Sequence, residues 1–347
     1  MRVLSVGSLE NQGVSNTCLQ RHHALCKVAS VVDVVNTAPA HCSMRFRVDY
    51  HLFLYGLSVR LPDETGANRK MLEMVDKNDY DVVWIDKGVT IFPETLRGVK
   101  QRQPKAIIVS YSPDNMALRH NQSLQYVAGV PLYDFIITNK SYIVDSMRQM
   151  GASHVIVVDN TFEPSFHHPY HLSEKEKERL GGAVGFIGMW EKERCEAVMA
   201  LARHGIPVRI WGGGRWNRYK NALPNLKIEG RGLFSDDYCK ALSAFNINLC
   251  FLRKMNFDRQ TTRSVEIPAC GGFMLAERTD EHQRLFTEDR EAVYFSSQEE
   301  LEQKCKYYLS HPEERESIAR AGYGRCLRSD YSNEGMIRRV FHEMGVL

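Results

Sequence analysis

The sequence predicts an α/β protein built from two Rossmann-like, doubly wound parallel sheets. Short apolar runs alternate with helical stretches along the first half of the chain, and the same alternation restarts near residue 183. Strands that alternate with helices at this spacing are typical of parallel sheets. The apolar runs are short and continuous, as expected of a sheet that helices cover on both faces. With 347 residues, the chain is long enough for about two domains of ordinary size.

In the first half, the strands are expected where β-branched and aromatic residues cluster, and the helices where apolar residues recur every three or four positions. The predicted strands are Val3–Val6, Val28–Val35, Val82–Ile85, Ala106–Ser110, Phe135–Thr138 and Val155–Val158. The predicted helices are Arg69–Asp76, Glu94–Lys100 and Tyr142–Met150. These elements define a first domain over residues 1–165.

A stretch rich in proline, histidine and charge, Glu163–Leu180, separates the two halves and ends in a polar helix. We place a linker at residues 166–182, a second domain at 183–330 and a C-terminal helix at 331–347 that could pack back on the first domain.

The second domain is expected to hold the strands Ala183–Ile187, Val208–Trp211, Ile247–Phe251, Phe273–Ala276 and Ala292–Phe295, with one short strand in 221–233. Its predicted helices are Glu191–His204, Asp236–Ala244, Thr262–Cys270 and Gln298–Leu309, the last with a capping box from Ser297 to Glu300. Two such halves joined by one linker predict a cleft between them, where ligands of these folds bind.

Composition narrows the class of protein. The net charge is +3, and there is no dense block of Lys and Arg, so nucleic acid is not an expected partner. No run of about 18 apolar residues and no signal-peptide pattern occurs, so we expect a cytoplasmic protein, with peripheral contact to a membrane left open. The nine cysteines are widely spaced without CxxC, which disfavours zinc and fits free thiols in a reducing compartment.

The segment from Arg253 to Glu277 carries the most informative chemistry. Asp258 and Glu266 are separated by seven residues, and Arg263 stands one helical turn before Glu266. A guanidinium can hydrogen-bond a phosphate with two parallel N–H groups, whereas an ionised carboxylate suits the hydroxyls of a ribose or hexose. The segment, with Thr262 and the turn at Gly271 and Gly272, therefore predicts contacts to both halves of a sugar nucleotide. The alternative is a polar loop whose charges are solvated.

Glycines follow strands in both halves and could let backbone N–H groups approach a phosphate. Gly7 follows the first strand, with Gly13 further on, and Gly188 follows the first strand of the second half. Gly212 and Gly213 come after Val208–Trp211. Because neither half has GxGxxG with an acidic residue about 20 positions on, a dinucleotide cofactor is not expected. Simple strand-to-helix turns are the alternative for each glycine.

Two aspartates follow strands of the first half. Asp86 lies in WIDKG and Asp114 in YSPDN, so both are expected at the carboxyl edge of the first sheet. An aspartate there could remove a proton from a sugar hydroxyl, with Asp114 the stronger candidate. Turn or capping roles are equally consistent with these residues. His167, His168 and His171 offer no fixed geometry for a metal, so we expect none.

Several of these runs resemble one family. RSVEIPACGGFMLAERTDEHQRLF and EAVYFSSQEELEQKCKYYLSHPEERESIARAG look like the C-terminal domain of the CgeB-like (spore-maturation protein CgeB) glycosyltransferases, which have the two-domain GT-B fold. VVWIDKG, SYSPDN and GFIGMWEKER also resemble this family, so the likeness covers most of the chain. It implies a transfer of a hexosyl or related sugar from a nucleotide-sugar donor, without a metal.

The resemblance also implies residue roles. The related retaining enzymes have two glutamates with seven residues between them. Glu266 matches the second, which holds the ribose, and Asp258 replaces the first. Arg263 falls where a basic group lies near the diphosphate, and Arg194 is a second candidate. We therefore expect the C-terminal half to hold a UDP-, GDP- or dTDP-sugar, and the N-terminal half to hold an acceptor such as a glycan, lipid-linked saccharide, protein or small molecule. The alternatives are a sugar-nucleotide epimerase or hydrolase on the same fold, and a non-catalytic sugar-nucleotide-binding protein.

Overall fold

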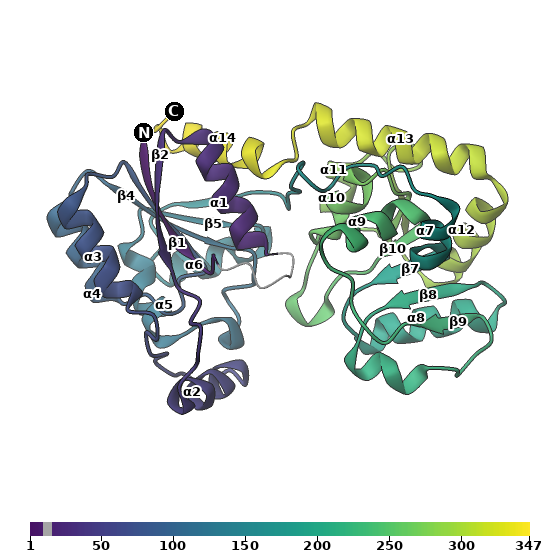
Figure 1. The fold of residues 1–347 in the computed structure, drawn as a ribbon, viewed down its shortest axis with the longest axis horizontal. Coiled ribbons are helices and arrows are strands. Elements are labelled where there is room, and N and C mark those ends of the chain that lie inside the picture. The colour runs from purple at the N-terminus through teal and green to yellow at the C-terminus, as the bar shows by residue number, and fades with distance from the viewer. Residues whose placement is uncertain (10–15) are drawn as a thin grey trace. The chain divides into compact units, whose positions relative to one another are not determined.

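The computed structural model describes residues 1–9 and 16–347, which form two compact units (Figure 1). Among the described residues, the first unit holds 1–9, 16–159 and 333–347, and the second holds 160–332. The chain therefore leaves the first unit after Asp159 and returns to it at Asn333. Gly13 lies outside the described residues.

A parallel six-stranded sheet forms the centre of the first unit. Its strands lie in the order β2-β1-β3-β4-β5-β6, and every neighbouring pair is parallel. Val3 of β1 pairs with Val32 on one side and with Val82 on the other. The strands are β1 (Arg2–Gly7), β2 (Val31–Asn36), β3 (Val82–Asp86), β4 (Ile107–Ser112), β5 (Phe135–Thr138) and β6 (Val155–Val157).

Helices cover both faces of this sheet. On one face, α1 (Thr17–Val28) and α14 (Asn333–Glu343) pack side by side (Figure 1). Leu25, Trp84 and Phe341 belong to the core between these helices and the strands. The other face is covered by α3 (Ala67–Lys77), α4 (Pro93–Arg102), α5 (Leu124–Gly129) and α6 (Val144–Gln149). Helix α2 (Met44–Leu54) lies at the periphery of the unit, away from the sheet (Figure 1).

The second unit repeats this architecture. Its strands lie in the order β12-β11-β10-β7-β8-β9, again all parallel. They are β7 (Gly182–Ile187), β8 (Val208–Trp211), β9 (Leu226–Ile228), β10 (Phe245–Cys250), β11 (Met274–Glu277) and β12 (Val293–Phe295). The helices are α7 (Glu174–Leu180), α8 (Lys192–Arg203), α9 (Ser235–Ala244), α10 (Arg263–Ala269), α11 (Asp280–Leu285), α12 (Gln298–Ser310) and α13 (Pro312–Arg328). Two apolar cores, one on each face of the sheet, hold these layers together.

The predicted fold class, with two parallel α/β sheets, is confirmed, and several details differ. Helices α1, α2, α5 and α11 were not predicted, and Val28 ends α1 instead of starting a strand. The capping box at α12 is only half formed. Ser297 accepts a hydrogen bond from the Glu300 N–H at 3.2 Å, but the Glu300 carboxylate accepts from the N–H of Ser296 and pairs with Arg278.

Candidate functional site

The second sheet has the strand order of a nucleotide-binding Rossmann sheet. Counted from β7, the first strand of the unit, the order is 3-2-1-4-5-6, with the reversal between β7 and β10. Ligands of such sheets bind beyond the carboxyl ends of the strands at the reversal point. Residues 188–191 follow β7 and residues 251–254 follow β10, so these two segments mark the expected site.

Two arginines meet at this point. The guanidinium carbons of Arg194, on α8, and of Arg263, at the start of α10, lie 5.6 and 5.5 Å from the centre of the Phe186 ring. Arg194 donates to the carbonyl of Met189 at 3.1 Å, and Arg263 donates to that of Phe251 at 3.5 Å. The Nε–H of each is buried without a hydrogen-bond partner among residues 1–9 and 16–347. Burial, and then the positive charge of Arg263, lower the pKa of Arg194. This is an arrangement that an anion would stabilise.

Positive charge exceeds negative charge around these arginines. One carboxylate, Glu191, lies 3.5 Å from Arg194 and 3.3 Å from Arg253, so it serves two guanidiniums. Two cavities open at this edge of the second sheet. The larger, of about 660 Å³, is lined by Met189, Trp190, Glu191, Lys192, Glu193, Gly214, Arg215, Arg253, Lys254 and Met255. Arg194 lines the smaller one, of about 160 Å³.

Gly188 and Gly212 allow the close packing around the arginines. A Cβ at Gly188 would lie 2.8 Å from the Phe186 ring and 3.4 Å from a terminal nitrogen of Arg263. A Cβ at Gly212 would lie 2.4 Å from the Gly188 carbonyl, which also accepts a hydrogen bond from the indole of Trp216. Gly188, Gly212, Arg194 and Arg263 are therefore brought together. Gly213 continues the same loop in more open surroundings.

Glu266 lies one turn into α10 and is buried by two partners that the sequence did not indicate. Its Oε2 accepts a hydrogen bond from the Tyr238 hydroxyl at 2.6 Å, and its Oε1 lies 3.5 Å from Nε2 of His167. Nδ1 of His167 accepts the N–H of Glu163 at 3.0 Å, so a neutral imidazole carries its proton on Nε2, toward Glu266. These contacts orient the carboxylate and leave lone pairs for further donors.

The other residues of the segment 253–277 separate into two groups. Thr262 precedes α10, and Asp258 lies in the loop between β10 and α10 with a half-buried side chain. Gly271 and Gly272 follow the far end of α10 and lead into β11, at the amino edge of the sheet and away from Arg263. Gly271 has φ +71°, and a Cβ at Gly272 would lie 2.6 Å from the Leu242 carbonyl. Turn geometry and packing account for both glycines. Because they lie at the opposite edge of the sheet from Arg263, their position does not support the predicted contact with the donor.

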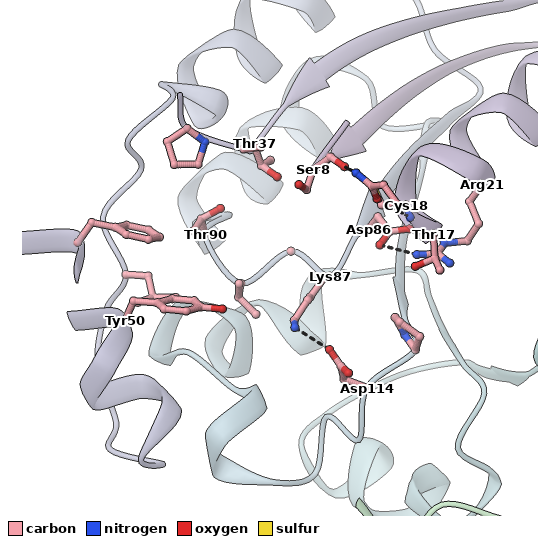
Figure 2. A pocket seen from close by; sticks show the side chains of 18 of the residues that line it. Ser8, Thr17, Cys18, Arg21, Thr37, Tyr50, Asp86, Lys87, Thr90 and Asp114 are labelled. Atoms are coloured by element: carbon pink, nitrogen blue, oxygen red, sulfur yellow. Dashed lines mark hydrogen bonds and ion pairs between the residues drawn. The ribbon is translucent and has the colours of Figure 1, made fainter. Parts of the chain in front are cut away.

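The first unit has its own cavity, of about 600 Å³, at the carboxyl edge of its sheet (Figure 2). Ser8, Thr37, Asp86 and Asp114 come from the ends of β1, β2, β3 and β4 and line it. Thus Asp86 and Asp114 line one cavity.

Asp86 and Asp114 differ in their ion-pair partners and in how far they are exposed. Asp86 is buried in a two-fold ion pair with Arg21, with N–O distances of 2.6 and 3.0 Å. Asp114 is 30% exposed and pairs at 2.6 Å with Nζ of Lys87 (Figure 2). Burial opposes the charge of Lys87, but the ion pair outweighs it and raises the pKa of Lys87. Asp114 is the more accessible carboxylate of the two.

Aromatic and hydroxyl groups complete this cavity, and the sequence did not single them out. Tyr50 and Phe46 of α2 stack with ring centres 5.5 Å apart, and in Figure 2 Tyr50 lies across the cavity from Arg21 and Asp86. Thr37 and Thr90 add hydroxyl groups. Burial, and then the charge of Asp86, raise the pKa of the Cys18 thiol, so Cys18 is not an activated nucleophile.

Within residues 1–9 and 16–347, no three His, Cys, Asp or Glu side chains are grouped as metal ligands. The sequence holds one Asp-x-Asp pair, Asp79 and Asp81, but it precedes β3 at the amino edge of the first sheet, and Asp81 accepts the N–H of Arg2. In the described part of the chain, no helix is long and apolar enough to cross a membrane.

Known proteins share this fold. Residues 193–341 match the family described as "Glycosyl transferase-like", whereas no curated protein is detectably similar in sequence. HepE of Anabaena, solved with UDP and glucose, is 12% identical with a TM-score of 0.61 over 100% of both chains. Sucrose-phosphate synthase of Thermosynechococcus elongatus is 12% identical, with a TM-score of 0.64 over 99% of this chain and 98% of its own. A trehalose-6-phosphate synthase is 11% identical, with a TM-score of 0.68 over 100% of this chain and 99% of its own. The protein therefore has the GT-B fold, and its residues 193–341 match the glycosyl transferase-like family.

Proposed function

We propose that the protein is a glycosyltransferase that takes its sugar from a nucleotide-activated donor held by the second unit. The observation that carries this proposal is the pair Arg194 and Arg263, whose buried Nε–H groups have no partner in the described residues and lie at the reversal point of a Rossmann sheet. Two neighbouring guanidiniums suit a diphosphate, because the one carboxylate beside Arg194, Glu191, is shared with Arg253. The family match over residues 193–341, and similar folds solved with UDP or UDP-glucose, support the same ligand class.

In the proposed reaction, the bond between the anomeric carbon and the diphosphate oxygen breaks, and an acceptor hydroxyl bonds to that carbon. Negative charge grows on the leaving diphosphate, where Arg263 and Arg194 would stabilise it. Their fixed positions over Phe186 mean that little reorganisation is needed as the charge develops. Since these cations take the role that a divalent ion has in other transferases, we propose metal-independent transfer.

Glu266 would hold the two hydroxyls of the donor ribose. The hydrogen bond from Tyr238 orients its carboxylate, and Nε2 of His167 lies 3.5 Å from the other oxygen, which lowers the entropy lost when a ligand is bound. The acceptor would bind in the cavity of the first unit, with Asp114 accepting its proton if the reaction inverts the anomeric centre. We also propose that the protein is a CgeB-like enzyme, that it acts in the cytoplasm, and that its donor carries a hexosyl or related sugar.

The test is a thermal-shift panel of UDP, GDP and dTDP with the wild-type protein, Arg263→Ala and the exposed control Arg290→Ala. A nucleotide at about 100 times its Kd should add roughly 2.7 kcal/mol of apparent stability. Stabilisation of the wild type and of Arg290→Ala, but not of Arg263→Ala, is the expected result. No stabilisation by any nucleoside diphosphate would refute the donor site. Complete turnover of a UDP-sugar without an acceptor would instead favour a hydrolase or epimerase.

A further inference from the structure

The periphery of the first unit exposes an unusual number of large apolar side chains. Of eighteen exposed large hydrophobic residues in the described chain, six fall within residues 44–57. They are Met44, Val48, Tyr50, Leu54, Tyr55 and Leu57. An isolated exposed hydrophobic side chain needs no explanation, but a group of this density marks an interaction surface.

Helix α2 is apolar on both of its long faces. Its inner face carries Phe53, which is buried, with Phe46 half-buried beside it. At 100° per residue, Met44, Val48 and Tyr55 fall on the opposite side, where the His51 ring contacts Tyr55, and all four side chains are exposed. A surface helix of a globular protein normally has a polar outer face, so the outer face of α2 is expected to be covered when the protein functions.

Two basic residues flank this outer face. Arg45 and Arg47 lie on α2, and both are exposed. Arg45 forms a long ion pair with Asp49, with an N–O distance of 3.6 Å. Arg119 belongs to the 3₁₀ helix η1 (Arg119–Asn121), against which α2 packs. Apolar side chains flanked by arginines are the composition of helices that lie in the headgroup region of anionic membranes.

We propose that the outer face of α2, together with the exposed side chains Leu54, Tyr55 and Leu57 at its C-terminal end, is a docking surface for an anionic lipid membrane. A second copy of the chain is the alternative occupant, which the experiment below distinguishes. An anionic lipid surface neutralises these arginines while it takes up Met44, Val48 and Leu54. The docking surface does not depend on the function proposed above.

The same helix borders the cavity of the first unit. Phe46 and Tyr50 line that cavity from the other side of the helix, so a docked α2 would place the cavity about one helix diameter, ~10 Å, from the lipid surface. Acceptor hydroxyls carried on lipids would then be within reach. This consequence for the acceptor rests on the proposed function, whereas membrane binding can be measured without it.

The experiment is flotation of the full chain with vesicles of phosphatidylcholine alone and of equimolar phosphatidylcholine and phosphatidylglycerol. The apolar variant is Val48→Ser with Leu54→Ser, at positions 51% and 53% exposed. Its matched control is Leu327→Ser with Leu347→Ser, at 54% and 52%. The charge variant is Arg45→Glu with Arg47→Glu, and Arg203→Glu with Arg320→Glu makes the same change in net charge elsewhere.

We expect the wild type and both controls to float with the anionic vesicles, and both α2 variants to bind at least about tenfold more weakly. Melting temperature and UDP binding, measured on the same samples, should stay unchanged, which separates lost docking from misfolding and from a failed donor site. Absence of binding to anionic vesicles would overturn the proposal, as would equal loss in variants and controls. A concentration-dependent dimer that the apolar variant abolishes, without vesicle binding, would assign the face to a second copy instead.

Discussion

Arg263 is the residue whose loss should affect the reaction most directly. Its guanidinium over Phe186 would interact more strongly with the leaving diphosphate as charge develops, so Arg263→Ala should lower kcat and kcat/KM together. Arg263→Lys should restore only part of the rate, because an ammonium does not reproduce the planar fork. Steady-state kinetics of both variants, with Arg290→Ala as the control, test this. A lower melting temperature with unchanged turnover per folded molecule would mark Arg263 as structural.

Glu266 and Tyr238 should act on donor affinity. A hydrogen bond to a charged group contributes roughly 1.5–3 kcal/mol, so Glu266→Ala should weaken nucleotide binding at least about tenfold. Tyr238→Phe removes only the hydroxyl that orients Glu266, so a smaller loss of donor affinity is expected, with kcat little changed. Calorimetric titration with UDP distinguishes these effects. Nucleotide binding that survives Glu266→Ala in a folded protein would contradict the assignment.

The two aspartates of the first unit should respond oppositely to the same change. Asp86→Asn breaks a buried ion pair with Arg21, which typically costs about 3–5 kcal/mol of folding stability. Asp114→Asn leaves the fold intact because its pair with Lys87 is partly exposed. If the reaction is inverting, Asp114→Asn should lose about a hundredfold or more in turnover while donor affinity stays normal. Urea unfolding and transfer rates of both variants test this, and a near-wild-type rate would exclude Asp114 as the base.

At the scale of elements, the junction between β11 and α12 should be sensitive to acid. Hydrogen bonds from Arg278, opposed by burial, lower the pKa of Glu300 from its ordinary value of 4.5 to about 2. Because the pKa is lower in the folded state, Glu300 stabilises the fold above about pH 4.5, and this contribution is lost as the pH falls toward 2. Glu300→Gln should therefore cost about 1–2 kcal/mol at neutral pH, a value reduced by solvent screening, and less in acid.

Urea unfolding near neutral pH and near pH 3 measures this difference. Glu313→Gln is the control, since Glu313 is exposed and also lies in the first turn of its helix, α13. A penalty for Glu300→Gln that is the same at both pH values would show that charge does not stabilise the junction.

The strands were predictable because a parallel sheet requires compact apolar runs. Phe135–Thr138 and Val208–Trp211 have the predicted bounds. The helices that were not predicted lack a clear helical pattern in their sequence. In α2, apolar residues occur on every side, so no helical period is visible, and aromatic and β-branched residues favour helices weakly. Only the structure shows that part of this helix is exposed.

The candidate site was predictable only where its chemistry is local. Arg263 and Glu266 lie on one helical turn, and the glycines follow strands, so their neighbourhood could be inferred from spacing. Tyr238 reaches Glu266 from 28 positions away, and Arg21 reaches Asp86 from 65. Such pairings depend on which strands are neighbours in the sheet, and a single sequence does not contain this order in its local pattern.

For the whole molecule, we expect transfer to continue in EDTA. The proposed charge stabilisation comes from Arg194 and Arg263, which a chelator does not remove. Initial rates with and without EDTA, and with added magnesium or manganese, measure this. Loss of activity in chelator that either metal restores would contradict the metal-independent mechanism.

The return of the chain to the first unit at Asn333 has a consequence for biosynthesis. Helix α14 supplies Met336, Ile337, Val340 and Phe341 to the core that covers Trp84 and Tyr111. The ribosome must therefore make the entire second unit, which takes on the order of ten seconds, before the first sheet can be closed on that face. The second unit, continuous from 160 to 332, can complete its core first. The part of the protein that is made first is thus the part that finishes folding last.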